Sequence, residues 1–211
     1  MENKKNEMTK FEMEHPTILQ DKFLRANSRF IAFGGAKGGG KIWAARSKAI
    51  LMGLNYPGIT IAFIGNNSAD LKDIANRAEN ETEGFAKLDG RRTILEFENG
   101  SRVLFRTVAS KQTHRLDGCE FDIIFILRTE LYNTCDVETM THLCRGNNNY
   151  PKRVYYIFDF CDGYVQENFI KGKYGRKINP EDYTLIEMDI EKGCMEWEET
   201  SVDNPVETYG A

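Results

Sequence analysis

Apolar residues along the chain fall into short continuous runs, and segments with the composition of helices separate these runs. A run of about six apolar residues predicts a strand that is buried on both faces. Strands of this kind, alternating with helices, are typical of a largely parallel sheet flanked by helices on both faces. The sequence therefore predicts an α/β fold. The predicted strands are 29–33, 59–64, 122–127, 153–158 and 183–190, and the predicted helices are 41–54, 68–77 and 135–143.

Two further apolar runs, 93–97 and 102–105, are joined by a signal for a tight turn. Asn99-Gly100 lies between them, and both residues tolerate the positive φ that a two-residue turn requires. We expect a β-hairpin here, either as an insertion or as an antiparallel edge of the sheet.

A glycine-rich segment follows the first predicted strand and precedes the first predicted helix. It fits the pattern GxxxxGK, in which glycines let successive backbone N–H groups turn toward a phosphate. The following helix adds the positive end of its dipole, and Lys41 would reach the β and γ phosphates. We therefore expect a phosphate-binding loop. Its residues are Gly35, Ala36, Lys37, Gly38, Gly39, Gly40 and Lys41.

The residue after the loop lysine departs from this pattern. Phosphate-binding loops have serine or threonine there, because the hydroxyl ligates Mg²⁺. Ile42 has no oxygen to offer and is bulky beside the phosphates. The ancestry of the loop and its present activity are therefore separate questions.

The composition excludes several classes of protein. With 211 residues, of which 41% are hydrophobic, the chain needs neither disulfides nor a metal, because one core can bury roughly 70% of its surface. The longest apolar run, 49–54, is far shorter than the roughly 18 residues of a membrane-spanning helix. Residues 1–16 are charged and lack the apolar stretch of a signal peptide, so we expect a cytoplasmic protein.

Charge is distributed unevenly along the chain. The last 31 residues, from Glu181, hold ten acids and only Lys192 as a base, a balance of −9, whereas the whole chain carries −4. Residues 1–180 therefore carry about +5, which is compatible with a polyanionic partner. The five cysteines form no CxxC pair, and free thiols are expected. His142 and Cys144 are expected to be ordinary helix residues, so no metal site is predicted.

Together with the glycine loop, several other segments carry a likeness to one protein family. These segments are 20–24, 29–41, 56–59, 97–102, 115–118, 121–126, 143–146, 150–156, 179–183 and, more weakly, 200–205. On them the sequence resembles the P-loop ATPase domain of tailed-phage terminase large subunits, the motors that package DNA into capsids. The resemblance implies ATP with Mg²⁺ as cofactor and double-stranded DNA as partner. It also implies portal and small-terminase partners and a homo-oligomeric ring in the host cytoplasm.

Residue by residue, the resemblance implies a nucleotide site. Gln20 matches a glutamine that reads adenine, Lys37 matches a residue that senses charge on the phosphates, and Lys41 holds the β and γ phosphates. Arginine is usual at the position of Lys37, and lysine keeps the charge without the bidentate fork. The implied catalytic residues are Lys37 and Lys41. The implied nucleotide-binding residues are Gln20, Gly35, Ala36, Lys37, Gly38, Gly39, Gly40, Lys41 and Ile42.

The second catalytic motif of the family is replaced in this chain. Where the family has an Asp-Glu pair, one acid for Mg²⁺ and one for the attacking water, this sequence has Leu127-Arg128. Leucine binds no metal, and arginine stays protonated and cannot act as a base. Asp122 lies about 16 Å away, at the other end of the strand. Glu130, just past the strand, is the candidate substitute, and the alternative is a solvated acid at a helix start.

A third departure follows the strand 153–158, where the family has an Asn-Pro-Gly-Gly-like turn that senses the γ-phosphate. Asp159 stands near that position, and a carboxylate repels phosphate unless a cation intervenes. Because three motifs are altered and the scaffold is kept, we expect a terminase-type ATPase domain with impaired or no ATP hydrolysis. The alternatives are a non-hydrolysing nucleotide- or DNA-binding module, natural or deliberately disabled, and a folded scaffold that binds no nucleotide.

The sequence also suggests a division into segments. We expect a polar leader at 1–16, the P-loop ATPase-like domain at 17–190 and an acidic segment at 191–211, with no nuclease domain in the chain. The basic, glycine-spaced loop 171–177 fits either a DNA backbone or a solvated surface. Arg145 fits either a contact between subunits or a solvated side chain.

Overall fold

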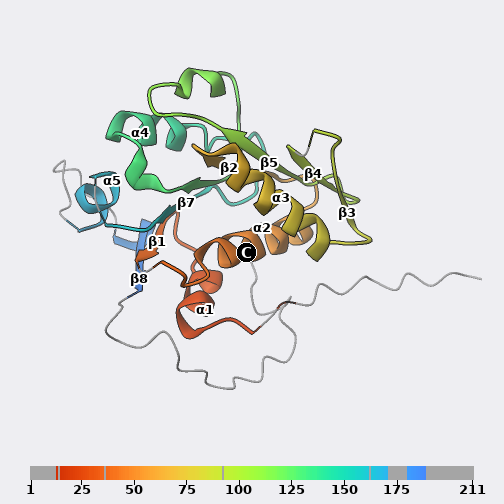
Figure 1. Cartoon of the computed structure of the whole chain (residues 1–211), viewed down its shortest axis with the longest axis horizontal. Coiled ribbons are helices and arrows are strands. Elements are labelled where there is room, and N and C mark those ends of the chain that lie inside the picture. The colour runs from red at the N-terminus through yellow and green to blue at the C-terminus, as the bar shows by residue number, and fades with distance from the viewer. Residues whose placement is uncertain are drawn as a thin grey trace, which may run out of the picture.

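A mostly parallel sheet forms the centre of the computed structural model (Figure 1), which describes residues 13, 15–35, 37–91, 93–161, 163–170 and 180–188. Among these residues the sheet has eight strands in the order β3-β4-β5-β2-β6-β7-β1-β8. From β5 to β8 in this order neighbours are parallel, whereas β3 and β4 form an antiparallel edge. The strands are β1 (Phe30–Gly35), β2 (Thr60–Gly65), β3 (Ala86–Leu88), β4 (Ile94–Phe97), β5 (Arg102–Thr107), β6 (Ile123–Leu127), β7 (Arg153–Phe158) and β8 (Tyr183–Met188).

The helices begin in two different ways. Thr17, Asn67 and Asn133 cap three of them with side-chain oxygens that accept backbone N–H groups. α2 instead begins at Gly40, which has no capping side chain, so the N–H groups of its first turn stay available for an anion. The helices are α1 (Ile18–Arg25), α2 (Lys41–Asn55), α3 (Ser68–Glu81), α4 (Thr134–His142) and the single turn α5 (Gly163–Val165).

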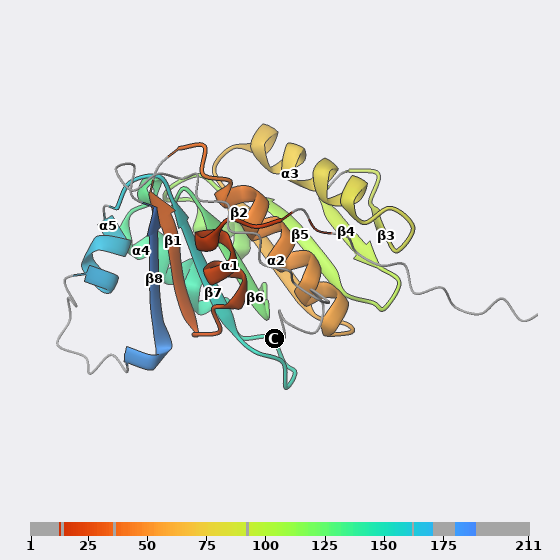
Figure 2. The same ribbon diagram turned by 90° about the horizontal axis from the view of Figure 1, so that it is seen from below.

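The two faces of the sheet build two hydrophobic cores. On β6, Phe125 points into the core under α1, α2 and α3, and Ile126 points into the core under α4 and α5. Figure 2 shows these helix groups on opposite sides of the sheet. Within the first core Phe125 stacks between Phe63 and Tyr155, with ring centroids 4.6 and 4.5 Å apart. Apolar residues at consecutive positions are therefore buried because each face is covered.

The predicted fold class is confirmed by this sheet, which is largely parallel and covered on both faces. The predicted hairpin forms β4 and β5 and lies at the antiparallel edge, although β5 also pairs with β2 in parallel. Strand β3, of three residues, was not predicted because it is too short to show a pattern. β1 extends through Gly35, beyond the predicted end at residue 33, and Asn67 rather than Ser68 caps α3.

The parallel strands bring their carboxyl ends to one edge of the sheet. β1 ends at Gly35, β6 at Leu127 and β7 at Phe158, and in space β7 lies between β1 and β6. The segments that follow these strands therefore meet. This edge of a parallel sheet is where ligands commonly bind in α/β proteins.

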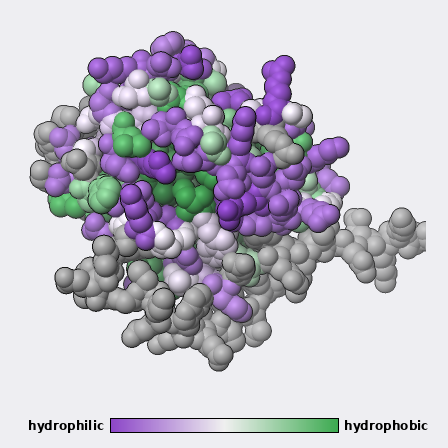
Figure 3. Space-filling model, in the orientation of Figure 1, coloured by the Kyte–Doolittle hydropathy of each residue, from purple (hydrophilic) through white to green (hydrophobic). Residues whose placement is uncertain are grey.

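The outer surface is polar over most of the face shown in Figure 3, with a limited apolar area near its centre. Among the described residues, no helix combines the length and the apolar character that a membrane crossing requires. In the part of the chain that the structure describes, four large apolar side chains are exposed: Ile18, Leu131, Phe160 and Ile170.

Candidate functional site

The glycine loop adopts a conformation that other residues rarely take. Gly35, Gly38 and Gly40 have φ values of 103°, 85° and 70°, in the left-handed region that glycine enters without strain. Gly40 also accepts the N–H of Ala44 on its carbonyl at 3.0 Å, which starts α2. The loop thus leads directly into the uncapped end of α2, as the pattern predicted. Ala36, a predicted binding residue, lies outside the described residues.

Gln20 of α1 holds the loop from the side. Its side chain is buried, its Oε1 accepts the N–H of Thr17 at 2.8 Å, and its Nε2 donates to the carbonyl of Gly39 at 3.1 Å. A Cβ on Gly40 would lie 2.3 Å from that Nε2, so a side chain there would displace the end of Gln20, and the φ of 70° favours glycine in addition. Gln20, for which the resemblance implied contact with adenine, thus lies next to the loop, and its amide is engaged within the chain.

Lys41 is held inside the loop by two oxygen atoms. Its Nζ donates to the carbonyl of Gly35 at 3.0 Å and lies 3.1 Å from Oδ1 of Asp159. Only 6% of the Lys41 side chain is exposed, compared with 23% for Asp159. Asp159 follows β7, the neighbour of β1, which explains why it reaches the loop. The carboxylate that we expected to repel phosphate is thus paired with the lysine of the glycine loop.

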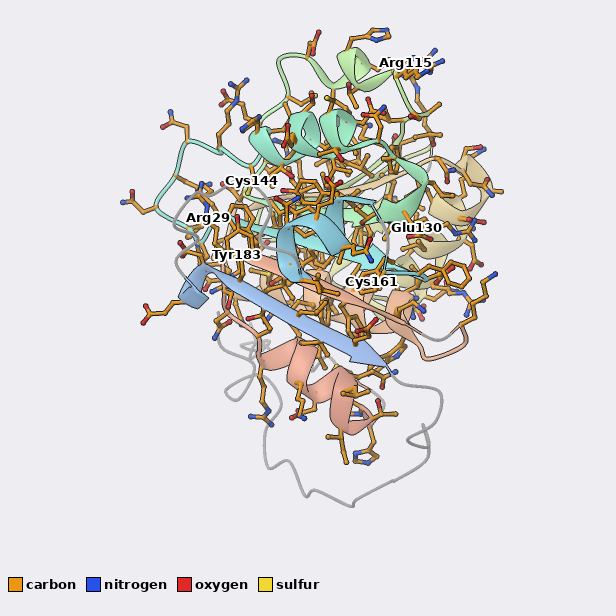
Figure 4. The ribbon with its side chains drawn as sticks, turned by 90° about the vertical axis from the view of Figure 1, so that its left-hand side faces the viewer. Arg29, Arg115, Glu130, Cys144, Cys161 and Tyr183 are labelled. Atoms are coloured by element: carbon orange, nitrogen blue, oxygen red, sulfur yellow. The ribbon has the colours of Figure 1, made fainter. Side chains whose placement is uncertain are left out.

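The segment after β6 brings two more charged residues to the same edge. Arg128 has a φ of 51°, an uncommon conformation for a residue with a side chain. Glu130 is half-buried and its Oε2 accepts the N–H of Asp159 at 3.4 Å. Burial raises the pKa of Glu130 above its ordinary value, and the charge of Asp159 adds to the rise, while backbone hydrogen bonds and Arg128 oppose it. Figure 4 shows Glu130 and Cys161 toward the carboxyl end of β8.

These residues line a pocket of about 610 Å³ at the carboxyl edge of the sheet. Lys37 lies at its rim, exposed, with its Nζ 5.7 Å from the centre of the Phe160 ring. A second pocket of about 510 Å³ lies between α2 and α3 and shares Ile42, Trp43 and Arg128 with the first. The first pocket is lined by Lys37, Gly38, Gly39, Gly40, Lys41, Ile42, Trp43, Arg128, Glu130, Leu131, Asp159 and Phe160.

No protein-family model and no curated protein matches this sequence. Among solved structures, the large-terminase ATPase domain of Thermus phage P74-26 matches with a TM-score of 0.59 and 15% identity, over 82% of this chain and 80% of that one. The ADP complex of the large terminase from a thermophilic bacteriophage matches with a TM-score of 0.64 and 12% identity, over 83% of this chain and 46% of that one. The fold is that of the large-terminase ATPase domain.

A third match is the large terminase of bacteriophage HK97, with a TM-score of 0.57 and 12% identity over 80% of this chain and 37% of that one. The chain therefore spans less than half the length of these two large-terminase chains. At identities of 10–15% the likeness concerns the fold, and the chemistry of the site has to be judged from the side chains present.

Within this large-terminase ATPase fold, the side chains do not fit a magnesium ion at the positions that the resemblance assigns to its ligands. Mg²⁺ is held by oxygen ligands, commonly one or two carboxylates together with substrate phosphates. Ile42 and Leu127 supply no oxygen, and Arg128 supplies a positive charge. The two pocket carboxylates are engaged, Asp159 by Lys41 and Glu130 by a backbone N–H. Across the described residues, no three His, Cys, Asp or Glu side chains converge as a metal site would require.

Two other charged residues from the sequence lie away from this site. Asp122, at the amino end of β6, is buried, accepts the N–H of Thr60 at 2.9 Å and lies 3.0 Å from Nζ of Lys152. Asp122 therefore lies at the amino ends of the parallel strands, opposite the end where the glycine loop lies. Arg145 lies 3.5 Å from Glu120, and both side chains are at least half exposed. The basic loop 171–177 and the acidic segment 191–211 lie outside the described residues.

Two contacts of the site were missed at the sequence level. Asp70 of α3 lies 3.4 Å from Arg128, and Lys41 lies beside Asp159. Both contacts join segments that are far apart in the sequence, and no local pattern marks them. An indication existed only for Asp159, because it directly follows a strand that was predicted to lie in the same parallel sheet.

Proposed function

We propose that this chain is a large-terminase-type ATPase domain of a phage DNA-packaging motor that binds nucleoside polyphosphate and hydrolyses ATP poorly or not at all. One observation carries the proposal. The glycine loop leads from β1 into the uncapped start of α2 with Lys41 inside it, while Ile42, Leu127 and Arg128 stand where the resemblance places the metal ligands and the catalytic acid. Gln20 and the loop residues 35–42 form the nucleotide site in this proposal.

The expected loss of hydrolysis follows from what the replaced groups would do. Transfer of a phosphoryl group requires positioned positive charge and a residue that orients the attacking water. Leu127 has no acid–base chemistry, and Arg128 stays protonated. Removing one preorganised catalytic group typically lowers the rate by about 10²- to 10³-fold. Glu130, three residues after the end of β6, is the candidate substitute acid, and Lys41 and Lys37 are the cations that would contact the phosphates.

The proposed partners are those of a packaging motor: double-stranded DNA, the portal, the small terminase subunit and further copies of the chain in a ring, in the host cytoplasm. Support comes from the match to phage large terminases over more than four-fifths of the chain. The balance of about +5 over residues 1–180 is compatible with a polyanionic partner.

A second candidate function is a folded scaffold that binds no nucleotide. The ion pair between Lys41 and Asp159 favours it, because a carboxylate on the loop lysine competes with a phosphate. Titration with a fluorescent ATP analogue separates the two candidates. The first requires saturable binding that is lost in Lys41→Ala, whereas the scaffold gives no saturable signal.

Phosphate release under saturating Mg-ATP tests the proposed loss of hydrolysis. We expect the wild type to release phosphate no faster than Lys41→Ala. The triple variant Ile42→Ser, Leu127→Asp, Arg128→Glu should release it measurably faster, because it restores the hydroxyl and both acids. Turnover by the wild type at the level of an active motor would contradict the proposal. A triple variant that folds, binds Mg-ATP and stays inert would contradict the ATPase origin.

A further inference from the structure

Arg128 is a charged residue of the loop pocket to which the proposed function has so far assigned no positive role. Its side chain is half exposed and lines both the loop pocket and the adjoining pocket between α2 and α3. It directly follows β6, at the position where the resemblance places the acid for the attacking water, next to the Mg²⁺ acid replaced by Leu127. The substitution therefore does more than remove an acid, because it adds a permanent positive charge beside the position of the metal-binding acid.

On the basis of the proposed function, we propose that Arg128 replaces the divalent cation, so that the site binds nucleoside polyphosphate free of metal. Three positively charged side chains line the loop pocket: Lys37, Lys41 and Arg128. A guanidinium suits this role, because its planar set of donors can bind two phosphate oxygens at once. The ligand class is thus the metal-free polyphosphate rather than its magnesium complex.

The present partner of Arg128 is easily displaced. Its Nη2 lies 3.4 Å from Oδ2 of Asp70, and the two side chains are 50% and 43% exposed. Ion pairs that are this exposed contribute little to stability, because water and salt screen them. A phosphate group carries more charge and offers shorter, charge-assisted hydrogen bonds. Replacing the contact between Arg128 and Asp70 by a contact between Arg128 and a phosphate group therefore favours binding of the polyphosphate.

A magnesium ion, in contrast, would meet unfavourable surroundings. It would lie in the same pocket as the Arg128 guanidinium, and like charges at short distance repel. It would also compete with Lys41 for Asp159 and with a backbone N–H for Glu130. Prior chelation of the polyphosphate by Mg²⁺ would, in addition, reduce the negative charge that the three positively charged side chains attract.

Calorimetric titration of the intact chain tests this inference, with ATP and inorganic tripolyphosphate as separate probes, each in EDTA and in excess Mg²⁺. We expect the wild type to bind ATP in EDTA at least as tightly as in Mg²⁺. Arg128→Ala should bind about tenfold more weakly in EDTA, because a charge-assisted contact is lost. Asp70→Asn should bind roughly two- to fivefold more tightly, because it releases Arg128.

Matched controls lie on α3. Arg77 and Asp73 also form an exposed ion pair, at 2.9 Å and with 62% exposure of each side chain, and neither lines the loop pocket. Arg77→Ala and Asp73→Asn should therefore leave both affinities unchanged. Circular dichroism checks that each variant is folded, and Asp70→Asn tests the inference independently if Arg128→Ala unfolds.

The outcomes separate this inference from the proposed function. Binding that requires Mg²⁺, or affinities of Arg128→Ala and Asp70→Asn equal to those of their controls, would overturn the role of Arg128 and leave nucleotide binding intact. No saturable heat with ATP in either buffer would overturn both. Binding of tripolyphosphate but not ATP would place a simple polyphosphate in the site and contradict the nucleoside part of the ligand.

Discussion

Lys48 shows how a single residue links protonation to stability. Its side chain is fully buried in α2, and its Nζ donates to the carbonyl of Leu24 at the end of α1. Burial lowers the pKa of Lys48 to about 7, with the charge of Arg153 acting in the same direction. Between that pH and 10.5, the ordinary pKa of lysine, the unfolded chain binds more protons than the folded chain. Stability contributed by this residue therefore rises with pH.

We predict that the free energy of unfolding increases from pH 7 to pH 9, by at most about 1.4 kcal/mol per pH unit from Lys48. Above this range Cys144 acts in the opposite direction, because burial raises the pKa of its thiol to about 12. Urea unfolding at three pH values measures the slope. Lys48→Met should flatten it, and Lys72→Met, at an exposed position of α3, should keep it. Equal slopes in the two variants would refute the prediction.

At the scale of elements, α1 and the glycine loop form one unit through Gln20. The side chain that completes the capping box of α1 also binds the carbonyl of Gly39. One amide thus fixes both the start of a helix and the position of the loop. The contribution of Gln20 to binding should consequently be the arrangement of the loop rather than contact with a base.

We predict that Gln20→Ala weakens the binding of ATP and of tripolyphosphate by the same factor, and lowers the free energy of unfolding by about 1 kcal/mol. If Gln20 instead reads adenine, only ATP binding should weaken. Arg25→Ala, which removes an exposed ion pair with Asp21 on the same helix, is the matched control and should change neither affinity.

The elements were predictable from sequence to different degrees, for physical reasons. Buried parallel strands such as β6, which is apolar at every position, and β7, which is apolar after Arg153, stand out, and Asn99-Gly100 marks the hairpin by its turn chemistry. β3 could not be predicted because its three residues pair only in the folded sheet. The loop was predictable from its glycines, which the backbone geometry requires. The ion pair between Asp159 and the loop lysine could not be predicted, because that contact depends on the order of the strands in the sheet.

At the scale of the whole molecule, the sheet joins two cores that share the same strands. A side chain in the middle of β6 therefore influences both faces through the backbone of one strand. Phe125 lies at the centre of the aromatic stack with Phe63 and Tyr155. We expect the described domain to unfold in one cooperative step because neither core can be lost alone.

We predict that Phe125→Ala lowers the free energy of unfolding by about 3–5 kcal/mol. Phe160→Ala, at a side chain that is 64% exposed, should change it by less than about 0.5 kcal/mol. Urea unfolding followed by circular dichroism and by tryptophan fluorescence measures both values. The two signals should give one midpoint in each variant, and separate midpoints would show that the two cores unfold independently.

The left-handed backbone conformation of Arg128 determines which residues a library screen should enrich at this position. A residue with a side chain in that conformation typically loses about 1 kcal/mol of stability relative to glycine. A library randomised at this position and screened for heat resistance alone should therefore enrich glycine or asparagine. The same library screened for retention of polyphosphate should keep arginine. The residue that each screen selects would measure separately the requirement of the fold and the requirement of the ligand.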